Sequence, residues 1–71
     1  MTKQCKRILD YLDMYGSITP IEALRDLGIM RLAARIYDIR SKLGIQIEDE
    51  IVQDINRMGE PIHYKKYKKV A

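Results

Sequence analysis

Residues 19–44, TPIEALRDLGIMRLAARIYDIRSKLG, decide the fold of this 71-residue chain. The segment opens with Thr19, Pro20 and Glu22, which together have the form of a capping box with proline at the first helical position. We therefore predict a short helix over residues 20–27. Its apolar side is formed by three residues, Ala23, Leu24 and Leu27.

A glycine turn and a second helix follow. Gly28 can take the left-handed conformation that ends a helix. The next helix is predicted over residues 31–43, with Gly44 as its stop. Two short helices joined by so few residues must cross at a steep angle, as in a helix-turn-helix.

The second of these helices has two different faces. At about 100° per residue, one side collects the apolar residues Leu32, Ile36, Ile39 and Leu43, with Ala33 beside them. The opposite side collects Arg31, Arg35, Asp38 and Lys42, with the small Ala34 at its edge. Arginine suits phosphate oxygens and guanine edges because its planar fork presents paired donors. An ordinary amphipathic helix with a basic solvated face would give the same pattern, but the capped helix before it favours DNA recognition.

Composition points to one small domain with no catalytic chemistry. The chain has no Trp or Phe, so its core must be aliphatic with tyrosine, and Cys5 and His63 each stand alone. A lone cysteine and a lone histidine cannot form a disulfide, a multi-cysteine zinc site or a triad. We expect no enzyme, no cofactor and no metal. We also expect no membrane span and no signal peptide, because charges interrupt the apolar residues of the N-terminal MTKQCKRILDYL.

A helix is predicted before the motif and a hairpin after it. The first helix should span residues 3–15, with an apolar stripe of Cys5, Ile8, Leu9, Leu12 and Tyr15 and with Gly16 as its stop. Whether Ile18 pairs as a very short strand stays open. Isoleucines at even spacing predict a strand over residues 45–52, and a turn marked by Gly59 and Pro61 leads to a second strand over residues 62–69.

This order of elements describes an α+β winged helix, a single domain over residues 1–71 with the hairpin as its wing. Tyr64 and Tyr67 cannot share one face of a regular strand, so a bulge or an exposed tyrosine is expected. The two halves of the predicted hairpin also carry opposite charge. Residues 48–61 carry five acids and one base, whereas residues 62–71 carry four lysines and no acid. The lysines would either pair with the acids across the strands or contact DNA phosphate.

The string ITPIEALRDLGIMRLAARIYDIRSKLG, most specifically over residues 31–40, resembles a family of small helix-turn-helix proteins of bacteria, phages and prophages. Their usual pattern is a threonine-capped helix with EAL, a glycine, and then R-L-A-A-R-I-x-D-L-R. The resemblance implies a winged helix that binds double-stranded DNA in a bacterial or phage-infected cytoplasm. A phage, prophage or mobile-element transcriptional regulator or a recombination accessory factor is the function it implies.

We expect the following residues to form the DNA-binding site. Arg31 and Arg35 would reach base edges, Asp38 would orient an arginine or accept from cytosine, and Lys42 would lie nearer a phosphate. Arg57 would approach the backbone or minor groove from the wing tip. The remaining members of the site are Met30, Ala34, Lys65, Lys66 and Lys68.

A protein-interaction module on the same scaffold is the alternative, with a host or phage protein as its partner. It is suggested by the acidic hairpin, because Glu48, Asp49, Glu50 and Asp54 would repel phosphate if they faced a duplex. No segment is devoted to dimerisation, so we expect a monomer in isolation, while a dimer on DNA stays open.

Overall fold

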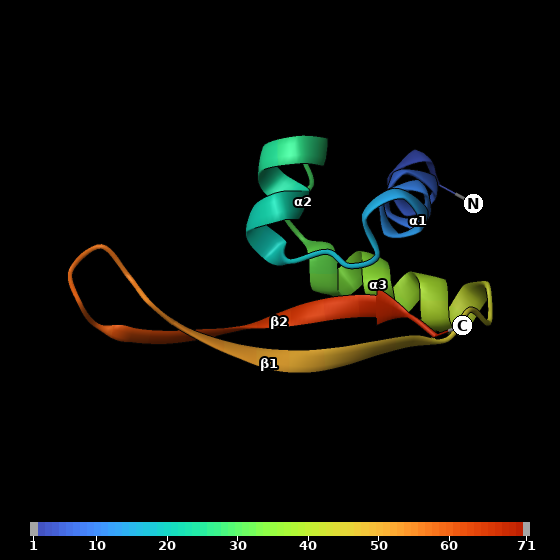
Figure 1. Ribbon diagram of the computed structural model, residues 1–71. Coiled ribbons are helices and arrows are strands. Elements are labelled where there is room, and N and C mark those ends of the chain that lie inside the picture. Colours follow the sequence, from blue (N-terminus) through green and yellow to red (C-terminus); the bar gives the residue numbers. More distant parts are fainter. Residues whose placement is uncertain (1, 71) are drawn as a thin grey trace.

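The computed structural model describes residues 2–70, in which three helices precede a two-stranded antiparallel sheet (Figure 1). The elements are α1 (Lys3–Tyr15), α2 (Pro20–Leu27), α3 (Leu32–Lys42), β1 (Ile47–Ile55) and β2 (Pro61–Lys69). In Figure 1, the three helices lie on one side of the sheet, and α1 and α2 each contact β2 directly. The hairpin runs along α3 and continues past α2 to an exposed tip. This arrangement confirms the predicted winged helix.

Within the described residues, no helix is long and apolar enough to cross a membrane.

The capping box predicted at Thr19 is present. The Thr19 hydroxyl accepts a hydrogen bond from the Glu22 backbone N–H at 3.3 Å, and the Glu22 carboxylate accepts one from the Thr19 N–H at 2.9 Å. At the other end of α2, Gly28 has φ 69° and its N–H binds the Leu24 carbonyl. These two ends define α2 because they satisfy backbone groups that have no partner inside a helix.

Substituting Thr19 by alanine should lower the free energy of unfolding by about 0.5–2 kcal/mol. The reason is that the Glu22 N–H would lose its acceptor at the start of α2. Chemical denaturation followed by circular dichroism measures this loss. A denaturation midpoint equal to that of the parent would show that the cap contributes nothing to stability.

The core lies where the three helices meet the base of the hairpin. Its buried apolar residues are Cys5, Ile8, Tyr11, Leu12, Ile18, Ala23, Ile29, Leu32, Ile36, Ile39, Ile47 and Tyr67. The expected apolar sides were wrong at four places. Tyr15 is 65% exposed and Tyr11 is buried in its place, while Leu24, Ala33 and Leu43 are also exposed. The physical reason at Tyr11 is a polar partner on α2, which an apolar pattern along α1 does not reveal.

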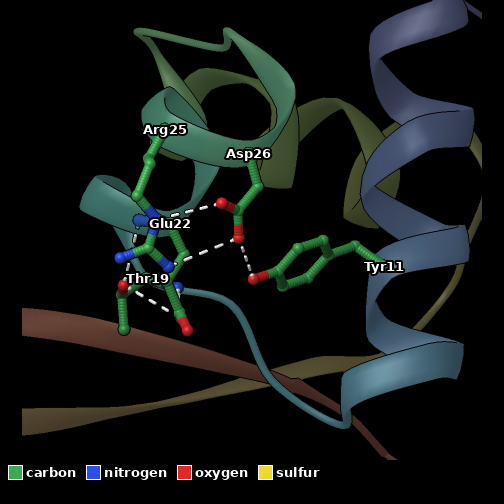
Figure 2. Close-up of polar contacts among 5 residues, drawn as sticks. All are labelled: Tyr11, Thr19, Glu22, Arg25 and Asp26. Atoms are coloured by element: carbon green, nitrogen blue, oxygen red, sulfur yellow. Dashed lines mark hydrogen bonds and ion pairs between the residues drawn. The ribbon is translucent and has the colours of Figure 1, made fainter.

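Tyr11 joins α1 to α2 through its hydroxyl (Figure 2). The hydroxyl donates to the Asp26 carboxylate at 2.6 Å, and the Arg25 Nε donates to the same carboxylate at 2.9 Å. The hydrogen bond to Asp26, together with burial, raises the pKa of Tyr11 from 10.0 to about 12. Arg25, and then Tyr11, lower the pKa of the Asp26 carboxyl. The contact thus couples an ionised carboxylate to a protonated phenol.

Replacing Tyr11 by phenylalanine should lower the free energy of unfolding by about 1 kcal/mol at neutral pH, because one hydrogen bond is lost. A pKa raised in the folded state stabilises the fold below pH 10, and the contribution is lost as pH rises toward 12. The difference between parent and Tyr11→Phe should therefore narrow over that range. Urea denaturation at several pH values tests this, and a pH-independent difference would contradict it.

The hairpin pairs in a regular register from Ile47 opposite Lys69 to Ile55 opposite Pro61. The expected range of about 62–69 agrees with β2 to within one residue, whereas the expected range of about 45–52 begins two residues before β1 and ends three residues short of it. Ile45 packs against the core before β1 begins. β1 then continues to Ile55 because backbone pairing at an exposed wing does not require an apolar face.

Three further features of the wing are its pairing with Ile18, the faces of its two tyrosines and the turn at its tip. Ile18 pairs with Tyr67 through two backbone hydrogen bonds of 2.9 Å, which answers the open question about Ile18. Tyr67 is buried and Tyr64 is half-buried, so they lie on different faces without a bulge. At the tip, the Asn56 side-chain oxygen accepts hydrogen bonds from the Met58 and Glu60 N–H groups. An asparagine turn of this kind holds the hairpin closed.

Candidate nucleic-acid interface

The turn before α3 leads to a shallow hollow at the start of that helix. Its volume is about 310 Å³, and its lining residues are Pro20, Met30, Arg31, Leu32, Ala33, Ala34 and Tyr67. Met30 is 83% exposed, and Arg31 is the only charged residue of the lining. Three predicted site residues, Met30, Arg31 and Ala34, are thus brought together. The small alanines leave room for another molecule to approach Arg31.

The three cations predicted on α3 differ in their surroundings. Arg31 is exposed, and it has no ion pair within residues 2–70. The Arg35 guanidinium instead lies 3.3 Å from the Asp38 carboxylate and is only 30% exposed. The Lys42 Nζ lies 3.9 Å from the same carboxylate. The single charge of Asp38 is therefore shared between two neighbouring cations, whereas Arg31 has no ion pair within residues 2–70 and is the most available cation of this surface.

The lysines of β2 divide in a similar way. Lys65 lies 3.8 Å from Asp49, and Lys68 lies 3.3 Å from Glu50, so the cross-strand pairing predicted from the charges is present. Lys69 instead reaches Asp13 on α1 at 3.1 Å. Among the described residues, Lys66 and the tip residue Arg57 have no ion pair. These two are the cations of the wing that are left for phosphate.

Two acids of the hairpin have cationic neighbours that offset their negative charge. Asp49 has two cationic neighbours, Lys65 and Arg40, and Glu50 has Lys68. Opposite charges at these distances cancel most of each other's field beyond about one Debye length, roughly 8–10 Å in physiological salt. The repulsion between phosphate and these two acids is correspondingly reduced, whereas Glu48, Asp54 and Glu60 have no ion pair among the described residues.

Two residues with a place at this surface were missed from the sequence. Arg40 donates to the Ile47 carbonyl from Nε at 3.0 Å and from a terminal nitrogen at 2.6 Å, so it ties β1 to α3. Tyr37 is 69% exposed on α3. The helical spacing of Ala33, Tyr37 and Ser41 could have indicated this second exposed stripe.

Comparison with protein families gave one match. The model of a family described as a winged helix-turn-helix domain matches residues 3–68. This range contains all of the helices, β1 and nearly all of β2. Neither the curated proteins nor the solved structures gave a match.

Proposed function

Because this chain belongs to the family of winged helix-turn-helix domains, we propose that it binds double-stranded DNA through α3 and the wing. Helix-turn-helix domains place the second helix of the motif in the major groove and use neighbouring segments on the backbone. Here α3 would enter the groove with its N-terminal end foremost. Arg31 would read a base edge, and Arg57 and Lys66 would contact phosphate.

The observation that carries the proposal is the surface at the start of α3. It joins an exposed arginine, which has no ion pair within residues 2–70, to a hollow lined by small and apolar side chains. Arginine is the side chain that most often makes specific contacts with guanine. Arg35, Lys42, Lys65 and Lys68 would add phosphate contacts only after leaving their acidic neighbours, whereas Asp38 would position Arg35.

A regulatory or recombination role would follow from such binding. We propose that the chain acts in a bacterial or phage-infected cytoplasm, as a phage, prophage or mobile-element transcriptional regulator or as a recombination accessory factor. It would be a monomer in isolation and could pair on DNA with two half-sites. Helix-turn-helix domains are generally binding modules without enzymatic activity, which agrees with this role.

A salt titration of binding to a generic duplex tests the proposed function. Fluorescence anisotropy gives the affinity at each salt concentration. The two proposed phosphate contacts, from Arg57 and Lys66, should give a slope of log affinity against log salt of about −1.8, at roughly 0.9 per contact. A slope near zero, or no binding at low salt, would overturn the proposal.

A variant pair tests which lysine of β2 takes part. Lys66→Gln should flatten the slope by about 0.9, because it removes one phosphate contact. Lys69→Gln is the matched control, since it removes the same charge from the same strand but from a lysine held by Asp13 at 3.1 Å. An equal change in both variants would mean that only net charge matters.

The protein-interaction alternative is favoured by one different feature. A groove of about 500 Å³ separates α2 from the outer part of the wing and is mostly apolar. Its lining residues are Pro20, Ile21, Leu24, Met30, Asp54, Ile62 and Tyr64. Absence of duplex binding at low salt would make this groove the first surface to test against protein partners.

A further inference from the structure

The side of α3 turned away from the core offers few hydrogen-bond donors. Residues three or four apart share a face of a helix, which places Ala33, Ala34, Tyr37 and Ser41 in one stripe. Ala33, Tyr37 and Ser41 are exposed and Ala34 is half-buried. The Ser41 hydroxyl donates its hydrogen to the Tyr37 carbonyl at 2.8 Å, so it is satisfied within the helix. The stripe therefore presents the alanine methyl groups and the tyrosine ring, with the Tyr37 hydroxyl as its exposed donor.

Most of the charged groups beside this stripe are held by other groups of the protein. Arg35 and Lys42 lie against Asp38, and Arg40 is directed to the Ile47 carbonyl. Arg31 alone remains as a polar base reader at the edge of the hollow that also contains Met30, Ala33 and Ala34. A duplex docked on this side would meet one arginine and a mainly apolar surface.

One feature of the bases in the major groove matches the alanine methyl groups and the tyrosine ring of this surface. Thymine carries a C5 methyl group there, and alanine or an aromatic side chain can contact it, whereas the other edges require donors or acceptors. Resting on the proposed function, we infer that Ala33, Ala34 and Tyr37 recognise pyrimidine C5 methyl groups. The class of ligand is duplex DNA with thymines facing α3, anchored by Arg31 at one end.

A set of synthetic duplexes of equal length tests this inference without a known operator. The first has alternating A·T pairs, and the second has deoxyuridine at every thymine, which removes the methyl group and leaves charge and hydrogen-bonding groups unchanged. A second pair compares alternating G·C with the same duplex containing 5-methylcytosine. Anisotropy at low salt should show tighter binding to the methylated member of each pair. About fourfold is expected for each methyl contacted, which is the factor that corresponds to roughly 0.8 kcal/mol.

Variants locate the effect on α3. Tyr37→Ala should reduce the preference for the methylated duplexes while the salt-dependent binding persists. Tyr15→Ala is the matched control, because Tyr15 is a similarly exposed tyrosine on α1 and should leave the preference unchanged. Circular dichroism establishes that both variants are folded.

Failure of this inference differs from failure of the proposed function. Equal affinities for methylated and unmethylated duplexes, with binding still present, would overturn methyl recognition alone. An equal loss of preference in the Tyr15 and Tyr37 variants would remove α3 as its source. No binding to any of the four duplexes would overturn the DNA-binding function itself.

Discussion

Arg31→Ala should weaken binding to a selected duplex about 5- to 150-fold, or about 1–3 kcal/mol. Arg31 is exposed at the start of α3 and has no ion pair among residues 2–70. It also borders the hollow where a base edge would lie. The effect should exceed that of Arg35→Ala, because Arg35 must leave Asp38 at 3.3 Å before it can contact DNA.

Fluorescence anisotropy with a duplex obtained by selection from a random pool measures this loss. Arg7→Ala is the matched control, since Arg7 is exposed on α1 and its removal changes the net charge by the same amount. Equal affinities for the Arg31 and Arg7 variants would remove Arg31 from base recognition.

Ile18→Ala should lower the free energy of unfolding by about 2–5 kcal/mol, the range for truncating a buried isoleucine. The Ile18 side chain is fully buried, and its backbone joins the link between α1 and α2 to Tyr67 of β2. At roughly 0.05–0.15 kcal/mol per residue, a domain of this size has only a few kcal/mol of total stability. The variant should therefore be largely destabilised at room temperature.

The control for Ile18 is another isoleucine of the chain. Ile51 is 55% exposed on β1, and Ile51→Ala should cost much less because little apolar surface returns to water. Thermal melts followed by circular dichroism compare the two variants with the parent. Similar melting temperatures for Ile18→Ala and Ile51→Ala would contradict the assignment of the core.

The helical part of the fold could be predicted because its signals are local. Thr19, Pro20 and Glu22 define the start of α2 within four residues, and Gly28 defines its end. The hairpin was less accessible, since strand ends depend on pairing between residues far apart. Ile18 shows this most clearly. Its partner, Tyr67, is 49 residues further along the chain, and the sequence alone left its pairing open.

The sequence indicated which residue types form the candidate site. It indicated less well which of their charged side chains are free to contact DNA. The sequence places Arg31, Arg35 and Lys42 together on α3, and the spacing of Asp38, three residues from Arg35 and four from Lys42, is the spacing of helical neighbours. The sequence could not show that Arg31 has no ionic partner from another element among residues 2–70. Tyr11 and Arg40 were missed for a related reason. Their partners, the Asp26 carboxylate and the Ile47 carbonyl, belong to other elements, so their positions depend on tertiary structure.

The central claim is that DNA lies across the start of α3 and the wing, and mapping by nuclear magnetic resonance tests it most directly. Backbone amide signals of the labelled protein would be followed while a duplex is added. The account predicts the largest shifts at Met30–Tyr37 and at Arg57 and Lys66, with little change at Arg7 and Tyr15 on α1. Shifts concentrated on α1, or in the groove between α2 and the wing while α3 stays unchanged, would contradict it.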